Sequence, residues 1–253
     1  MNRRGITAIY AFEMARARRT LWQSLVAPVI TTSLYFLVFG TAIGSRMSTM
    51  DGVQYGSFIV PGLIMLSVLT QSLMNASFGI FFPKFTGTIY ETLSAPITPL
   101  ETTFAYVGAA VTKSVVLALV TLATAAVLVE VRIDHPLLML IFLIAISSGF
   151  SLLGFAIGIW AKNFEQLQVV PLLVVTPLTF LGGVFYSVDA LGEPWRTVTH
   201  LNPILYLVSG YRWTFFGVAD VPLGASVAVM AGAILIPLAA ITWIFRTGYR
   251  LKN

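Results

Sequence analysis

The chain contains a run of 25 residues without a charged side chain, Phe58-Ile-Val-Pro-Gly-Leu-Ile-Met-Leu-Ser-Val-Leu-Thr-Gln-Ser-Leu-Met-Asn-Ala-Ser-Phe-Gly-Ile-Phe-Phe82. About 20 apolar residues are enough for a helix to cross the hydrocarbon core of a bilayer. The other apolar segments are Ser24–Ile43, Phe104–Val129, Pro136–Trp160, Val169–Phe185 and Ala225–Phe245. The pattern predicts an all-α integral membrane protein with six transmembrane helices.

The composition agrees with this class. Of the 253 residues, 57% are hydrophobic and 10% are charged, whereas a soluble domain carries about 25% charged residues. Six spans leave only short connections, so the sequence excludes a separate soluble catalytic domain. Cysteine is absent, which excludes disulfides, thiolate metal sites and cysteine nucleophiles.

The distribution of basic residues predicts that both termini are cytoplasmic, because short loops rich in Lys and Arg resist translocation. In that orientation the inner stretches hold ten basic residues: Arg3, Arg4, Arg16, Arg18, Arg19, Lys84, Lys162, Arg246, Arg250 and Lys252. The outer stretches hold four: Arg46, Arg132, Arg196 and Arg212. The N-terminal cluster is typical of a topology signal or an anionic-lipid contact, so we expect membrane lipid and no nucleic acid as its partner.

Residues 1–22 are predicted to form an amphipathic helix on the membrane surface. Its apolar face over Gly5–Leu21 consists of Ile6, Ile9, Tyr10, Met14, Ala17 and Leu21, with Arg4, Arg16, Arg18 and Arg19 directed away from it. Phe12 and Glu13 interrupt the pattern. Two roles remain open: a lipid anchor that sets orientation, and an interfacial helix that relays motion into the first span.

The cytoplasmic loop over residues 83–99 is longer than a simple connector requires. Phe85, Ile89 and Leu93 recur at intervals of four, which predicts a short helix resting one apolar edge on the bundle. Such a helix would present Lys84, Thr88, Glu91 and Thr92 outward. It would serve as a docking element for a cytoplasmic partner or as an idle interfacial helix.

The second span carries a polar stripe of Ser67, Gln71 and Asn75, again at intervals of four. Amide side chains are unfavourable in hydrocarbon unless they are paired, so the stripe should face protein or water. It either joins helices or lines a pathway opposite Thr176 and Thr179 of the fifth span.

Two further features lie inside spans. Lys113 either extends its long side chain to the inner interface or is a buried charge with a pairing or substrate role. The fourth span has a small-residue face, Ser147, Ser151, Gly154 and Gly158, which predicts close helix packing.

Residues 182–220 are too apolar for an open loop and too rich in Gly and Pro for a spanning helix. Irregular backbone at membrane depth must be buried in protein or line a cavity, so we expect short re-entrant helices between the fifth and sixth spans. They would form an outer gate or a passive cap.

Catalytic, metal-binding and nucleotide-binding motifs are missing. No lysine follows a glycine, so the chain has no phosphate-binding Gly-Lys-Ser/Thr loop. His135 and His200 lie outside the spans without a serine or carboxylate constellation. We therefore expect no catalytic residue, metal ligand or cofactor on this chain, and an energy source on another protein.

The chain resembles the membrane (permease) subunit of ABC exporters of the ABC type 2 class, across nearly its whole length as a single domain, residues 1–253. The resemblance rests on the basic N-terminal helix, the polar loop over Phe85–Pro96 and three motifs. The motifs are Phe58-Ile-Val-Pro-Gly-Leu-Ile-Met, Thr176-Pro-Leu-Thr-Phe-Leu-Gly-Gly-Val-Phe-Tyr-Ser, and Leu201-Asn-Pro-Ile-Leu-Tyr with Gly210-Tyr-Arg.

The resemblance implies a homodimer in the bacterial inner membrane, bound to two copies of a separate ATPase subunit that holds ATP and Mg. The loop would be the coupling helix, and the second and fifth spans would line the route. Phe185, Tyr186, Asn202 and Tyr206 would belong to the outer gate. The polar stripe favours an amphiphilic, drug-like or lipid- or saccharide-linked cargo.

Other classes remain as alternatives. An ion-coupled secondary transporter needs acidic residues at mid-membrane, and the spans carry none. A membrane assembly protein without transport activity, or an intramembrane enzyme, would be recognised by the lack of an ATPase partner.

Overall fold

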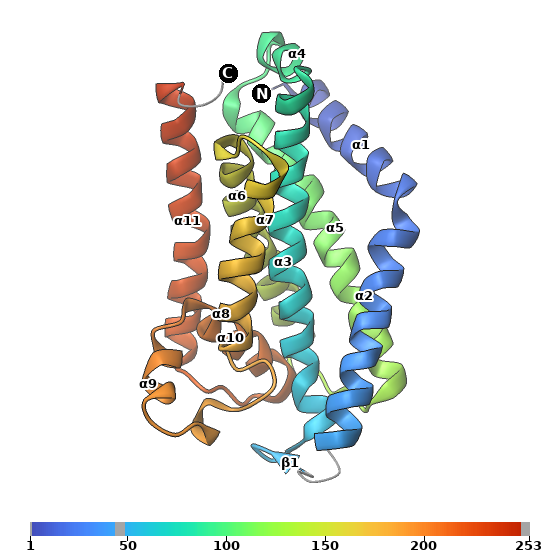
Figure 1. Ribbon diagram of the computed structural model, residues 1–253, viewed down its shortest axis with the longest axis vertical. Helices are drawn as coiled ribbons and strands as arrows, with labels where there is room; N and C mark the ends of the chain where they lie inside the picture. The colour runs from blue at the N-terminus through green and yellow to red at the C-terminus, as the bar shows by residue number, and fades with distance from the viewer. Residues whose placement is uncertain (1, 44–48, 249–253) are drawn as a thin grey trace.

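The computed structural model describes residues 2–43 and 49–248. Its long helices run along one common direction (Figure 1). In chain order the elements are α1 (Arg3–Arg19), α2 (Leu21–Tyr35), the π-helical η1 (Phe36–Ile43), β1 (Thr49–Met50), β2 (Val53–Gln54), α3 (Tyr55–Thr86), α4 (Ile89–Ser94), α5 (Pro99–Leu128), α6 (Pro136–Trp160), α7 (Phe164–Val170), the π-helical η2 (Pro171–Val175), α8 (Thr176–Phe180), the 3₁₀ turn η3 (Val188–Ala190), α9 (Trp195–His200), α10 (Pro203–Phe216) and α11 (Leu223–Thr247). Three residues of the charge count, Arg46, Arg250 and Lys252, lie outside the described ranges.

The helix lengths confirm the predicted membrane class. Four helices are long and apolar enough to cross a membrane: α3, α5, α6 and α11. α1 and α2 meet at a bend of 60° and provide a fifth if the pair is taken as one span. The apolar helix over Phe164–Phe180, which corresponds to the fifth predicted segment, is shorter. Among the described residues, length and composition thus show four or five helices that could span a membrane, and the count of six stays a prediction.

The centre of the bundle is the contact between α3 and α6. A Cβ atom at Gly154 would lie 2.2 Å from the carbonyl oxygen of Leu73, and one at Gly158 would lie 2.4 Å from that of Ser77. Both glycines belong to the predicted small-residue face of α6, so its packing role is confirmed. The hydroxyls of Ser72 and Ser147 add a hydrogen bond of 2.9 Å between the two helices.

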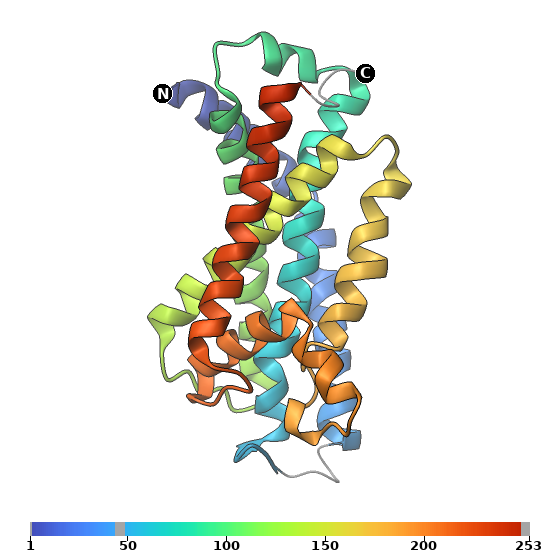
Figure 2. The ribbon, with the colours of Figure 1, turned by 90° about the vertical axis from the view of Figure 1, so that its left-hand side faces the viewer.

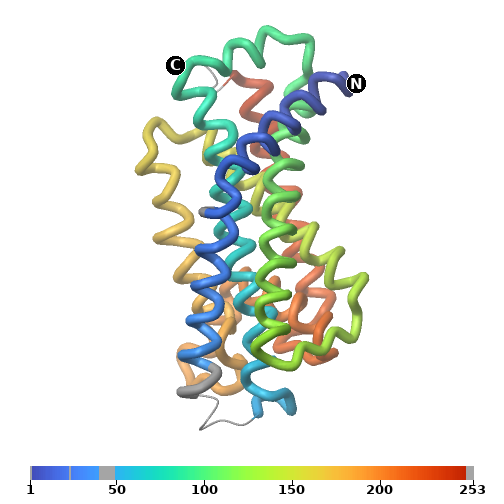
Figure 3. The backbone as a smooth tube through the Cα atoms, turned by 90° about the vertical axis from the view of Figure 1, so that its right-hand side faces the viewer, coloured from blue at the N-terminus to red at the C-terminus, as the bar shows by residue number. Residues whose placement is uncertain are grey.

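The two ends of the bundle differ in structure. α4, the start of α1 and the end of α11 lie together at one end, which we call the α4 end (Figures 2 and 3). The opposite end carries η3, α9 and a small addition to the predicted all-α fold, the antiparallel hairpin of β1 and β2 (Figure 1). Asp51 and Gly52, both with positive φ, form the hairpin turn.

The close approach of α3 and α6 yields a stability prediction. Gly154→Ala should lower the free energy of unfolding by about 1–3 kcal/mol, because the added methyl group meets backbone that cannot move without separating the helices. The measurement is thermal unfolding of the purified protein in detergent.

The matched control is Gly108→Ala in α5, where an added Cβ meets nothing within 4 Å. It should leave the melting temperature unchanged or raise it, since Ala is the better helix former. Equal melting temperatures for the two variants would contradict the assigned role of Gly154.

Candidate functional site

The segment between α3 and α5 contains a short helix, but in a different register from the predicted one. Gly87, in the left-handed conformation, ends α3, so Phe85 belongs to α3 and α4 begins only at Ile89. Ile89 is buried, whereas Phe85 and Leu93 are 61% and 40% exposed. The prediction of one continuous helix is therefore wrong, because the turn at Gly87 interrupts the four-residue spacing. Phe85 still packs on the bundle, with its ring centroid 4.9 Å from that of Phe164, whereas Leu93 is exposed.

Lys84 is the second correction. Its side chain is buried, and its Nζ donates hydrogen bonds of 2.7 Å to the carbonyl of Ile159 and 3.1 Å to that of Ala161. The last carbonyls of a helix lack partners within the helix, and an ammonium group satisfies them. Lys84 therefore fastens α3 to the end of α6 and is not presented outward as predicted.

The accessible part of this segment, which we call the α4 surface, combines charge, hydroxyl and apolar groups. Phe85, Thr88, Glu91 and Leu93 are exposed, and Thr92 is half-buried. These residues lie where the sequence predicts contact with a cytoplasmic partner, and their role in coupling stays a prediction.

The start of α1 is tied directly to the loop that follows α4. The backbone N–H of Asn2 donates to Glu101 Oε1 at 2.6 Å, and its side-chain amide donates to the Pro96 carbonyl at 3.0 Å. The same Glu101 closes the capping box of α5, accepting from the N–H of Thr98 at 2.8 Å. One carboxylate thus joins α1, the α4–α5 loop and α5.

A buried ion-pair cluster joins α1 to α5. Glu13 is 2% exposed, and its Oε2 lies 2.9 Å from Lys113 Nζ and 2.7 Å from Arg16 Nη2. Of the roles left open for Lys113, pairing is confirmed, and extension to the inner interface stays a prediction. Arg16 also turns inward, contrary to the predicted face, because Glu13 holds it there.

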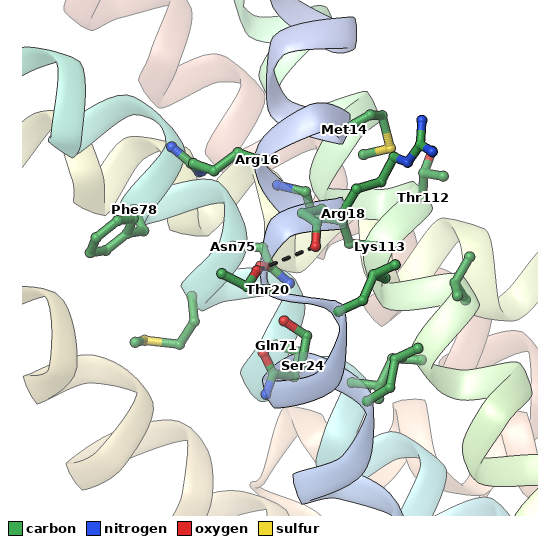
Figure 4. Close-up of a pocket in the computed structure, with 16 residues that line it drawn as sticks. Met14, Arg16, Arg18, Thr20, Ser24, Gln71, Asn75, Phe78, Thr112 and Lys113 are labelled. Atoms are coloured by element: carbon green, nitrogen blue, oxygen red, sulfur yellow. Dashed lines mark hydrogen bonds between the residues drawn. The ribbon is translucent and has the colours of Figure 1, made fainter.

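Next to this cluster lies a cavity of about 480 Å³, which we call the basic cavity. Side chains from α1, α2, α3 and α5 converge on it (Figure 4). It is lined by Met14, Arg16, Ala17, Arg18, Thr20, Leu21, Ser24, Leu25, Gln71, Met74, Asn75, Phe78, Thr112, Lys113, Val116 and Leu117.

The predicted path residues separate into two groups. Gln71 and Asn75 line the basic cavity, whereas Ser67, Thr176 and Thr179 are not part of its described lining. Thr179 is fully buried and donates its hydroxyl to the carbonyl of Val175 at 2.6 Å. Thr176 likewise bonds within its own segment, to the carbonyl of Pro171 at 2.8 Å. A shared path for the five residues stays a prediction.

Two of the predicted gate residues are aromatic and lie beside one another in the chain. The ring of Phe185 stacks on Phe39 at a centroid distance of 4.5 Å and on Phe180 at 5.5 Å. Tyr186 is half-buried. The first contact links the turn after α8 to η1.

The other two predicted gate residues organise the start of α10. Asn202 donates its side-chain amide to the Leu178 carbonyl at 2.6 Å, and its Oδ1 caps α10 by accepting from the N–H of Ile204. Tyr206 donates to the carbonyl of His200 at 2.9 Å. Both side chains fix α8, α9 and α10 relative to one another, and a gating role stays a prediction.

The sequence did not reveal the polar centre of residues 182–220. Arg212, 1% exposed, pairs with Asp220 at 2.7 Å and lies over the ring of Phe58 at 4.0 Å. Its Nη2 also donates to the carbonyl of Gly183. Asp220 Oδ1 accepts from the hydroxyl of Ser187 at 3.0 Å, so the pair joins α3, α10 and the turn after α8. The signal in the sequence that could have indicated this pair is Asp220, a carboxylate flanked by the apolar residues Ala219 and Val221.

In the part of the chain that the structure describes, no three His, Asp or Glu side chains come together as metal ligands.

Comparison with known proteins identifies this architecture. The ABC-2 type transporter family matches residues 4–216. The chain belongs to this family. It is 39% identical to the inner membrane transport permease YadH of Escherichia coli strain K12 over 249 residues, covering 98% of this chain and 97% of that protein.

More distant relatives share most of the length. Nodulation protein J of Rhizobium leguminosarum bv. viciae is 24% identical, with 88% of this chain and 85% of the relative covered. Nodulation protein J of Rhizobium meliloti is 21% identical, with 88% and 86% covered. Together with the long apolar helices, the family identifies a multi-pass permease of the inner membrane.

The buried ion pair of Arg212 and Asp220 can be tested by removing its carboxylate. Asp220→Asn should destabilise the protein by about 3–5 kcal/mol, because it leaves the Arg212 charge buried without compensation. Thermal unfolding of the purified protein measures the loss.

Asp189→Asn is the control, since the pair of Asp189 with Arg196 is exposed and should contribute at most about 1 kcal/mol. An Asp220→Asn variant as stable as this control would show that Arg212 does not depend on its carboxylate.

Proposed function

We propose that this chain is the transmembrane subunit of an ATP-driven exporter, energised by a separate ABC ATPase that docks on the α4 surface. The observation that carries the proposal is the shared position of α4, the start of α1 and the end of α11 at one end of the bundle (Figure 1). A partner bound there can contact the connection between α3 and α5 and the N-terminal helix together.

The sidedness follows from charge. Arg3, Arg4, Lys162 and Arg246 belong to the helix ends and loops of the α4 end. Since positive residues are retained in the cytoplasm, we assign the α4 end and both termini to the cytoplasmic side. The ATPase would find ATP and Mg there, while this chain supplies no phosphate-binding loop.

The proposed topology has six crossings. α2 with η1 forms the first, and α3, α5 and α6 form the next three. The helix over Phe164–Phe180 forms the fifth and α11 the sixth. The fifth rises only about 25 Å, less than the hydrocarbon thickness of about 30 Å. The segment containing η3, α9 and α10 would complete that crossing as a re-entrant outer region.

Two copies of the chain would associate with two ATPase subunits. The route for an amphiphilic, drug-like or lipid- or saccharide-linked cargo is assigned to α3 and to the fifth crossing. Gln71 and Asn75 support the α3 part of this assignment, because they line a cavity shared with α1, α2 and α5 rather than a packed helix interface.

Docking on the α4 surface is tested by Glu91→Ala. Because Glu91 is exposed and no described residue forms an ion pair with it, the variant should insert and assemble normally. It should lower the ATPase activity of the reconstituted complex several-fold, because a partner contact is lost. Glu193→Ala, which removes an exposed carboxylate from the outer region, should leave the activity unchanged.

Equal ATPase activity in the Glu91→Ala and wild-type complexes would remove the docking assignment. Transport by the purified chain without any ATPase would favour the alternative, an ion-coupled transporter.

A further inference from the structure

The basic cavity has an excess of positive charge. Arg16, Arg18 and Lys113 all line it, and its described lining contains no carboxylate. Glu13, buried behind the wall, pairs with both Arg16 and Lys113. One carboxylate therefore faces three cations, which leaves a net charge of about +2 beside the cavity.

Two of the cations retain hydrogen-bonding capacity. Arg16 donates to Glu13 through Nη2, while its Nη1 is buried without an acceptor among the described atoms. Arg18 has no carboxylate within ion-pair distance among the described residues. Neutral donors stand nearby, since Gln71 and Asn75 also line the cavity. Guanidinium groups with free donors match the oxygens of a phosphate group.

The cations of the cavity gather at one side, and the other side combines leucines with Ser24 and Gln71. The basic side chains lie toward the α4 end, above Ser24 and Gln71 in Figure 4. Leu21, Leu25 and Leu117 of the lining come from positions one to two helical turns closer to the middle of the bundle. A ligand that fits this arrangement carries an anionic head and an apolar tail.

The location also favours a ligand from the membrane. The cavity lies at the bend between α1 and α2, where Trp22 is 83% exposed. Tryptophan favours the depth of lipid headgroups. Further along α2, Ile30 is 54% exposed and provides an apolar surface for a chain extending from the cavity. A volume of about 480 Å³ is in the range of small-molecule sites, enough for a headgroup and the first part of its tails.

We propose that the basic cavity binds the phosphate headgroup of an anionic membrane lipid. Arg18 holds the phosphate on the α5 side of α1, Arg16 and Lys113 add positive charge, and the apolar lining contacts the first methylene groups. The proposal is independent of the transport cycle, because binding requires neither nucleotide nor an ATPase.

The experiment is lipid retention by the full chain, measured by native mass spectrometry after purification with equal amounts of phosphatidylglycerol and phosphatidylcholine. Wild type should retain phosphatidylglycerol preferentially. Each basic residue near an anionic headgroup contributes about a fivefold preference. Arg18→Gln should therefore reduce the preference about fivefold, and the Arg16→Gln/Arg18→Gln double variant about 25-fold.

The control is the Arg3→Gln/Arg4→Gln double variant, which removes the same charge from exposed positions of the same helix outside the cavity. It should keep the wild-type preference. An equal loss in the control would assign binding to general surface charge and overturn the site.

Two further outcomes would overturn the proposal. One is the absence of any preference in wild type. The other is release of the lipid by millimolar inorganic phosphate together with binding of that phosphate, which would identify a site for the free anion. Because Arg18 is exposed, the single variant should remain folded, and its melting temperature verifies this.

Discussion

The structure depends on the direct contact between the backbones of α3 and α6. Helices in a membrane gain little from the hydrophobic effect against each other, so close packing and hydrogen bonds must hold them together. Gly154 and Gly158 provide this on α6, and Gly62 of α3 does the same toward the outer region, where a Cβ atom would lie 2.4 Å from the carbonyl oxygen of Val184. α3 is thereby fixed to α6 along the bundle and to the turn after α8 at one end. Its polar side chains can then face a cavity without loss of packing.

Buried charges organise two parts of the molecule in the same way. Near the bend between α1 and α2 Glu13 joins α1 to α5, and at the end opposite α4 Asp220 joins α10 to the turn after α8 through Arg212. A charge removed from water is tolerated only when a partner neutralises it, so each pair restricts how far its elements can separate. The two clusters differ in net charge. Asp220 and Arg212 neutralise one another, whereas the cluster around Glu13 keeps surplus positive charge next to open space.

The sequence was sufficient for the membrane class, for the helical segments and for the packing face of α6, because hydrophobic length and small-residue spacing are local signals. It failed at one local turn and where a contact joins distant parts of the chain. The intervals of four around Ile89 predicted one helix, and Gly87, a helix-ending residue within that interval, was the signal that decided against it. Lys84 and Arg16 are charged residues of a type usually found at the surface. Folding brings Lys84 to the carbonyls at the end of α6 and Arg16 to the carboxylate of Glu13, and these contacts turn both side chains inward.

The hydrogen bonds of Asn2 have a mechanical consequence. Because Asn2 is hydrogen-bonded to both Pro96 and Glu101, the start of α1 is coupled to the α4–α5 connection and to the start of α5. A displacement of α4 would therefore be passed to α1 through these hydrogen bonds. Since α1 forms one wall of the basic cavity, such a movement would change the width of that cavity.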